Sequence, residues 1–218
     1  MNAWIIGAGA QGRVVLDILR AGNRYDSISF IDDNPALQRS RINDAEVLGG
    51  FDLTLTPDPA RAEMIVALGD PLVRLRLARL IVERGGRFLN AIHPSAVIMG
   101  GVALGVGNMI AAAAVVNCDS RVGDHTIVNT GAVIEHDCIL EDGSAVGPGA
   151  CVGGRAHLER ACFVSAGAIV ISRVRIGSES VVGAGAVVTK DLPPRVLALG
   201  VPARITEHLE NFDWKRVL

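Results

Sequence analysis

His136 and Asp137 are the residues of this 218-residue chain whose types and spacing are best suited to chemistry. An imidazole titrates near neutral pH, so it can take a proton from an attacking group, and a neighbouring carboxylate supports its protonated form. His136 follows the aliphatic Ile134 by two residues, at a position that we expect to be a corner with an outward side chain. The pair therefore predicts general-base chemistry at the surface of the fold.

A glycine-rich loop near the N-terminus predicts a second kind of chemistry. Residues Gly7-Ala8-Gly9-Ala10-Gln11-Gly12 read G-x-G-x-x-G between a predicted strand, Ala3–Ile6, and a predicted helix, Gly12–Ala21. The N–H groups of such a loop and helix start favour a phosphate or pyrophosphate. Asp32 and Asp33 follow about twenty residues later, where a dinucleotide fold binds a ribose. Taken alone this pattern predicts NAD, and the alternative is that the glycines only allow close helix–strand packing.

The first ninety residues alternate strand-like and helix-like segments. Ile28–Ile31 and Met64–Leu68 are predicted strands, and Pro71–Arg84 is a predicted helix, which together indicate a small parallel sheet. Ninety residues hold only half of a doubly wound sheet, and no second glycine loop follows. We therefore predict that residues 1–90 form a half-Rossmann-like domain for one nucleotide diphosphate.

From residue 96 to residue 191 the chain repeats every six residues. Each of the sixteen hexads has an aliphatic residue at one place and a mostly small residue two positions earlier. This period predicts a parallel β-helix over residues 91–191, with three hexads in each triangular coil and a little over five coils. Glycine directly follows the aliphatic residue in several hexads, where we expect tight corners to favour a residue without Cβ. These glycines are Gly105, Gly123, Gly147, Gly153, Gly177 and Gly183.

The amino-acid composition limits which kinds of molecule the protein is expected to bind. The chain is 50% hydrophobic but only 4% aromatic, which suits a solenoid built from small aliphatic side chains. A net charge of −2 supplies no basic field for nucleic acid or anionic lipid. No basic leader precedes an apolar stretch and no apolar window reaches membrane-spanning length, so we predict a cytoplasmic protein without membrane insertion.

The cysteines and the other histidines are predicted to be structural. The four cysteines lack the C-x-x-C spacing of metal ligands, and two of them fall in the small column inside the coil, so we predict packing roles and no metal. His93 is expected to cap or pack at the entry to the β-helix, and the remaining three histidines lie in hexads or a tail without a matching context. The residues concerned are Cys118, Cys138, Cys151, Cys162, His125, His157 and His208.

The two halves together resemble the sialic-acid and bacillosamine O- or N-acetyltransferases, which acetylate hydroxyl or amino groups of sugars, commonly nucleotide-activated ones. The resemblance covers essentially the whole chain. It rests on Ile5 to Gly12, Phe30-Ile31-Asp32-Asp33, Ile65 to Gly69, Ile92-His93-Pro94-Ser95-Ala96, Asn129 to Cys138, and Gly200-Val201-Pro202-Ala203-Arg204. It implies an N-terminal domain that binds a nucleotide sugar, a left-handed β-helix that trimerises, and acetyl-CoA between neighbouring helices.

The resemblance also assigns the reacting groups. His136 matches the catalytic base, Asp137 takes the place of an acidic neighbour that is often Glu, and Asn129 matches an active-site asparagine. Gly154 lies one coil of eighteen residues after His136, and its N–H resembles the donor that holds the thioester oxygen. The acetyl-CoA pocket is expected to include Gly183 and Arg204 as well.

For the sugar nucleotide, the family pattern matches the glycine loop and the two aspartates. Gly7, Gly9 and Gly12 match the phosphate loop, and Asp32 and Asp33 match contacts to the base. Carboxylates can accept from uracil, guanine or thymine, so all three bases fit. Gln11 stands where many members have a histidine.

The end of the chain and the assembly complete the expected architecture. Leu192-Pro193-Pro194 breaks the repeat, residues 192–218 are predicted to cap the last coil, and Glu207–Phe212 is predicted to be helical. A corner residue on a flat-sided prism needs a second wall to exclude water, so we predict a homotrimer with sites shared between subunits.

The leading hypothesis is an acetyl-CoA-dependent N-acetyltransferase acting on the amino group, the 4-amino group, of a UDP-, GDP- or dTDP-linked deoxy sugar. One alternative is an O-acetyltransferase on free sialic acid or another sugar hydroxyl. Further alternatives are a non-catalytic nucleotide-binding trimeric scaffold and an NAD-dependent reductase.

Overall fold

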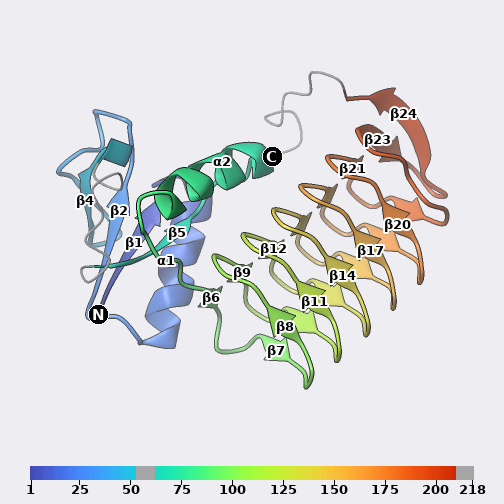
Figure 1. The fold of residues 1–218 in the computed structure, drawn as a ribbon, viewed down its shortest axis with the longest axis horizontal. Coiled ribbons are helices and arrows are strands. Elements are labelled where there is room, and N and C mark those ends of the chain that lie inside the picture. The colour runs from blue at the N-terminus through green and yellow to red at the C-terminus, as the bar shows by residue number, and fades with distance from the viewer. Residues whose placement is uncertain (53–61, 210–218) are drawn as a thin grey trace.

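The computed structural model describes residues 1–52 and 62–209, which form an α/β domain followed by a parallel β-helix (Figure 1). The sheet of the α/β domain has the order β3-β4-β2-β1-β5, and all its pairs are parallel except β3 with β4. β1, β2 and β5 correspond to the three predicted strands, and β3 and β4 extend the sheet beyond β2. The strands are β1 (Asn2–Ile6), β2 (Ser27–Ile31), β3 (Arg41–Ile42), β4 (Ala45–Gly49) and β5 (Glu63–Val66).

The two helices predicted from the sequence are present. α1 connects β1 to β2, and α2 follows β5 and leads to the β-helix. α1 (Ala10–Gly22) begins after Gly9, which supplies no side-chain cap, and ends at Asn23 in the left-handed region. α2 (Pro71–Val82) begins after Asp70, whose carboxylate accepts from the N–H groups of Leu72 and Val73. Neither helix of the described residues is long and apolar enough to cross a membrane.

The β-helix has three faces. We call them the docked face, which carries the α/β domain, the apolar face and the charged face. The docked face contains β6 (Ala91–Ile92), β9 (Met109–Ile110), β12 (Ile127–Val128), β15 (Ala145–Val146), β18 (Phe163–Val164), β21 (Val181–Val182), β23 (Val196–Leu199) and, antiparallel at its edge, β24 (Arg204–His208). The apolar face contains β7 (Val97–Ile98), β10 (Val115–Val116), β13 (Val133–Ile134), β16 (Cys151–Val152), β19 (Ile169–Val170) and β22 (Val187–Val188). The charged face contains β8 (Ala103–Leu104), β11 (Arg121–Val122), β14 (Ile139–Leu140), β17 (His157–Leu158) and β20 (Arg175–Ile176).

The hexad prediction is confirmed strand by strand. The aliphatic residue of each hexad is the second residue of one strand from β7 to β22, and strands eighteen residues apart pair in parallel, as Val116, Ile134 and Val152 do. These side chains fill the interior of the prism, with only Ile98 and Leu104 in the first coil partly exposed. Burying each one contributes roughly 1.5–3 kcal/mol, so the column is the main source of β-helix stability.

The corners turn at a different residue from the one expected. In every hexad from Gly101 to Gly185 the residue with positive φ lies three positions after the aliphatic residue, not directly after it. The glycines that directly follow the aliphatic residue avoid a collision with the next coil instead. A Cβ on Gly153, for example, would lie 2.6 Å from the backbone nitrogen of Ser172. The expectation that these glycines form the turn is therefore wrong, because stacking of the coils, not φ, excludes a side chain there.

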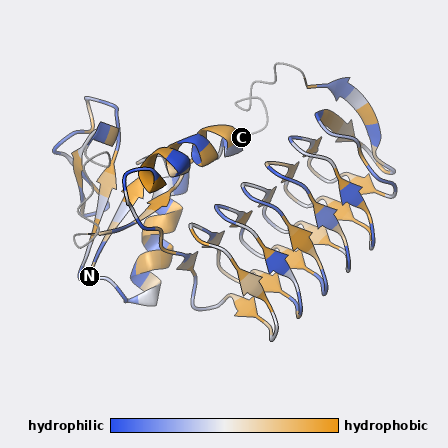
Figure 2. Cartoon of the chain, in the orientation of Figure 1, coloured by the Kyte–Doolittle hydropathy of each residue, from blue (hydrophilic) through white to orange (hydrophobic). Residues whose placement is uncertain are grey.

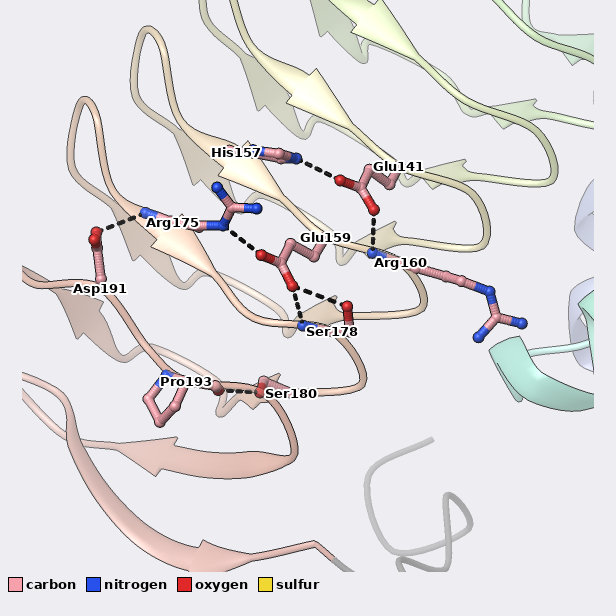
Figure 3. A network of polar contacts seen from close by, with 9 residues as sticks. All are labelled: Glu141, His157, Glu159, Arg160, Arg175, Ser178, Ser180, Asp191 and Pro193. Carbon is pink, nitrogen blue, oxygen red and sulfur yellow. Dashed lines mark hydrogen bonds and ion pairs between the residues drawn. The ribbon is translucent and has the colours of Figure 1, made fainter.

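Carboxylates on the charged face join successive coils (Figure 3). Glu141 accepts from His157 Nε2 at 2.6 Å on the next coil and from the N–H of Arg160 at 3.1 Å. Glu159 repeats this arrangement with Arg175 and Ser178 one coil further. On this face the first residue of β11, β17 and β20 is hydrophilic and that of β14 is hydrophobic, as the alternating colours in Figure 2 show.

Two of the four cysteines predicted to pack are buried, whereas Cys118 is exposed and Cys151 is half-buried. Among the described residues all four cysteines are free, and Cys138 and Cys162 are buried in the coil, where burial raises the pKa of both thiols. His93 accepts from the N–H of Ser95 at the entry to the β-helix. The predicted helix Glu207–Phe212 is wrong for Glu207, which belongs to β24, and its last three residues lie outside the described residues.

The α/β domain and the β-helix share one hydrophobic core. Val15 and Leu19 of α1 belong to the same buried cluster as Ala91, Ala111 and Ile127 of the docked face. Figure 1 shows α1 between the sheet and the first coils. The glycine loop that precedes α1 is therefore held at a fixed position on the β-helix.

Arg74 of α2 forms the second connection between the two parts. It is almost fully buried, and it donates from Nε to the carbonyl of His125 at 2.9 Å and from Nη2 to the carbonyl of Gly143 at 2.8 Å. Nη1 donates to the carbonyls of Leu68 and Gly69 at 2.7 and 2.9 Å. One guanidinium thus joins the loop before α2 to two coils of the β-helix.

We predict that Arg74→Leu lowers the free energy of unfolding by about 3 kcal/mol or more, because several buried carbonyls lose their donor together. Equilibrium urea unfolding at one protein concentration measures the change. Arg79→Leu on the same helix is the matched control. Its side chain is 82% exposed and forms a surface ion pair with Glu83, so the change should stay within about 1 kcal/mol. Equal losses in the two variants would contradict a bridging role for Arg74.

Candidate active site

His136 and Asp137 form the predicted pair on the corner between the apolar and charged faces, which we call the base corner. His136 Nδ1 lies 2.8 Å from Asp137 Oδ2, and both side chains are about half exposed. The contact leaves Nε2 free of this carboxylate, on the side where a proton could be accepted. The hydrogen bond from His136 is the largest cause that lowers the pKa of Asp137, so this carboxyl stays ionised.

Gly154 and Arg155 lie one coil further along the base corner. A Cβ on Gly154 would stand 2.7 Å from His136 Nε2, so the imidazole lies directly against this residue. The N–H of Arg155 donates to the carbonyl of His136 at 2.9 Å, and its Nε lies 3.5 Å from Asp137 Oδ2. The predicted stacking of Gly154 on His136 is therefore present in the structure.

A cavity of about 850 Å³ lies at another place, between the α/β domain and the corner that joins the docked and apolar faces. We call this corner the cavity corner. The glycine loop supplies Gly7, Gly9 and Gln11 to its wall, and β2 is followed there by Asp32. The β-helix supplies Asn129 and Gly183. Six of the residues predicted from sequence to bind ligands therefore meet in one cavity.

The three glycines of the loop are needed for different structural reasons. Gly7 has a φ of 102°, and a Cβ on Gly12 would lie 2.0 Å from the carbonyl oxygen of Gly7, so both are explained by packing. A Cβ on Gly9 would meet nothing within 4 Å. Gly9 also precedes α1, whose first turn has no acidic residue and no side-chain cap. The helix start thus offers N–H groups to an anion at the cavity.

Asp32 and Asp33 both hold loops in place. Asp32 accepts from the N–H of Ala8 at 2.8 Å and from that of Asn34 at 2.9 Å, which ties the glycine loop to the end of β2. Asp33 accepts from the N–H of Phe51 at 2.6 Å and lines a smaller cavity of about 190 Å³ that also includes Gly7 and Asp32. Each carboxylate retains lone pairs for a further donor.

The structure does not bring all predicted site residues together. His136 and Gly154 are on the base corner, Asn129 and Gly183 are on the cavity corner, and the strands of the apolar face separate the two corners. Arg204 lies exposed on β24 and does not line the 850 Å³ cavity. Gln11 faces the cavity and donates from its amide to Met109 Sδ.

Several cavity residues were not identified from the sequence. Ser165 and Gly183 follow Asn129 by two and three coils of eighteen residues, so the repeat itself could have placed Ser165 on the cavity corner. Phe163 points outward from β18 by the same alternation that makes Val164 point inward. Leu197 and Leu199 come from β23, beyond the repeat, and no sequence signal indicates them.

Comparison with known proteins identifies the family of the chain. The PglD N-terminal domain family matches residues 2–81. A variant of perosamine N-acetyltransferase from Caulobacter crescentus, solved with CoA and GDP-perosamine, is 36% identical with a TM-score of 0.89, over 95% of this chain and 97% of that one. The acetyltransferase domain of PglB from Neisseria gonorrhoeae, solved with acetyl coenzyme A, is 30% identical with a TM-score of 0.91, over 94% and 98%.

A third structure, WeeI from Acinetobacter baumannii, is 27% identical with a TM-score of 0.87 and is covered over its full length. No curated protein matches the chain. The fold is thus an α/β domain joined to a left-handed β-helix of hexapeptide repeats. The chain belongs to the hexapeptide-repeat sugar N-acetyltransferases and is an acyltransferase.

We predict that Gly154→Ala lowers the rate of acyl transfer by about 10²-fold, because the new Cβ displaces the imidazole that it would touch. The acyl-transfer rate and the far-ultraviolet circular dichroism of the variant measure function and fold separately. Gly100→Ala is the matched control, since Gly100 occupies the same place in its hexad three coils earlier and a Cβ there meets nothing within 4 Å. An unchanged rate in Gly154→Ala would show that this contact has no role in the reaction.

Proposed function

We propose that this chain transfers the acetyl group of acetyl-CoA to the 4-amino group of a nucleotide-linked deoxy sugar. The main support for this proposal is that both kinds of site occur in one chain. The same chain has an ionised carboxylate on an outward imidazole and, on another corner, a cavity whose glycine loop has an unfilled position at a helix start. Two similar structures, described above, hold CoA with GDP-perosamine and acetyl coenzyme A.

The cavity suits the sugar nucleotide. The N–H groups at Gly9 would bind the diphosphate, and Asp32 and Asp33 would accept from the base. The sugar would then extend toward Asn129 and Gln11 on the opposite wall. Uracil, guanine and thymine remain equally compatible with carboxylate acceptors.

The base corner suits the acyl step. The amine nitrogen of the sugar attacks the thioester carbonyl carbon, and His136 Nε2 takes the proton that this nitrogen loses. The N–H of Gly154 would hold the oxyanion of the tetrahedral intermediate. Collapse of the intermediate breaks the carbon–sulfur bond, and the CoA sulfur leaves with the proton that His136 returns. The products are the amide and free CoA, and no acyl-enzyme is required.

A homotrimer would unite the two corners. The outward residues of the apolar face form a continuous exposed or half-buried apolar stripe, namely Val97, Val115, Val133, Cys151, Ile169 and Val187. Three such faces around a threefold axis would set the base corner of one subunit beside the cavity corner of its neighbour. The cavity corner leaves space for this approach, since Cβ atoms on Gly131, Gly149, Gly167 and Gly185 would meet nothing within 4 Å.

We predict that Ile169→Glu dissociates this trimer, because it places a charge in the centre of a dehydrated interface. Sedimentation equilibrium measures the mass. Ile139→Glu is the matched control, since Ile139 is an equally exposed outward isoleucine on the charged face, at 40% against 44% for Ile169. Dissociation by Ile139→Glu alone, or monomeric wild-type protein, would contradict this arrangement.

The function is tested by release of CoA thiol from acetyl-CoA with a panel of UDP-, GDP- and dTDP-linked 4-amino sugars beside free sialic acid. We expect turnover of one nucleotide amino sugar, a loss of about 10²- to 10⁴-fold in His136→Ala, and a raised KM for that sugar in Gly9→Glu. Turnover of sialic acid alone would place the chain with the O-acetyltransferases. Binding of sugar nucleotides without turnover of any acceptor would support a scaffold.

A further inference from the structure

Asp137 has a second partner besides His136. Its Oδ2 atom lies 2.8 Å from His136 Nδ1 and 3.5 Å from Arg155 Nε, so one oxygen faces both groups. We propose that Arg155 is a positioning residue that shares the Asp137 carboxylate with His136 and thereby keeps the imidazole neutral and able to accept a proton. This inference rests on the proposed function only in taking His136 as the base.

The backbone fixes this arrangement. Asp137 and Arg155 occupy the same corner position on successive coils, with φ of 58° and 62°. The N–H of Arg155 donates to the carbonyl of His136 at 2.9 Å, so the two coils cannot slide past each other at this point. The guanidinium therefore reaches Asp137 from the coil beyond it, while His136 reaches Asp137 from the preceding residue.

The charges explain why the arrangement matters for a base. A carboxylate alone beside an imidazole stabilises the imidazolium form and would hold the base protonated at working pH. A guanidinium beside the same oxygen offsets part of the negative charge of the carboxylate and repels the imidazolium. Asp137 can then orient the ring through Nδ1 while it shares its negative charge with the guanidinium. The lowered pKa of Asp137, caused by the hydrogen bond from His136 and next among the charges by Arg155, agrees with a shared ionised carboxylate.

The neighbouring groups do not supply this cation. Cys118 and Asp119 occupy the coil before His136 and Asp137, and Glu135 precedes His136 with its carboxylate held by Asn117 at 3.2 Å. Arg173 lies one coil beyond Arg155 and has no ion pair among residues 1–52 and 62–209. Within the same ranges Arg155 is the one basic residue other than His136 that pairs with Asp137.

The test measures the pKa of His136 directly, by the pH dependence of its imidazole carbon–proton signals in nuclear magnetic resonance. The His136 signal is the one missing in His136→Gln. In Arg155→Gln we expect this pKa to rise by about 0.2–0.7 units, as an exposed ion pair allows. The acidic limb of the pH profile for kcat/KM should move up by the same amount. Arg155→Lys keeps the charge and should restore most of the wild-type pKa.

Arg173→Gln is the matched control, because it removes the same charge from the same corner one coil away. An unchanged or lower His136 pKa in Arg155→Gln would overturn the proposal. Equal rises in Arg155→Gln and Arg173→Gln would also overturn it, since they would reflect overall charge and not the shared carboxylate. The resonance measurement needs no substrate, so absence of acetyl transfer by the wild-type protein would defeat the proposed function without deciding this inference.

Discussion

The relation between the α/β domain and the β-helix depends on one buried guanidinium. Arg74 is held by backbone carbonyls from both parts of the molecule and forms no ion pair within residues 1–52 and 62–209. Burial lowers its pKa to about 10, which leaves it charged at neutral pH. Its planar group can donate in several fixed directions at once, which a lysine ammonium on a flexible stem cannot reproduce. Together with α1 on the docked face, it fixes the wall of the cavity formed by the glycine loop.

The fixed domain arrangement gives the single chain two separate half-sites. The cavity has features suited to a phosphate and a sugar, but His136 is not among its lining residues. The base corner has an imidazole, a carboxylate and a stacked glycine, all of them on an open edge of the prism. An exposed general base gains little from preorganisation unless water is excluded, so the geometry of each half-site by itself favours assembly with another surface.

The repeat made most of the β-helix predictable from the sequence. A period of six determines which residue points inward, and a period of eighteen determines which residues stack, so His136 over Gly154 required no structure. Arg155 was missed because an exposed arginine has no pattern of its own, and its importance depends on where Asp137 points. β3 was missed because it has only two residues, whereas β4 has five, as many as β1 and β2, and pairs in parallel with β2, a partner that its own sequence does not indicate. The segment at Glu207 was assigned to a helix although it pairs with Leu197 of β23.

The three glycines of the loop show how a glycine required for packing can be distinguished from one that leaves space for a ligand. Gly7 and Gly12 are required by the fold of the loop itself, whereas no residue that the structure describes occupies the space beside Gly9. A sequence motif does not make this distinction, because all three positions read the same. It follows from asking what a methyl group would touch at each position.

The eighteen-residue coil also gives the β-helix a regular spacing along its axis. Because each coil advances by the spacing of neighbouring strands, about 4.8 Å, distances along a corner come in whole steps of that length. Insertion or deletion of one complete coil would lengthen or shorten the path along the base corner by one step and leave every side chain on its own face. A change of one residue within a strand would turn the aliphatic side chain of that strand toward solvent. Reach along such a corner can therefore evolve only in discrete increments, while the chemistry at each step can vary one residue at a time.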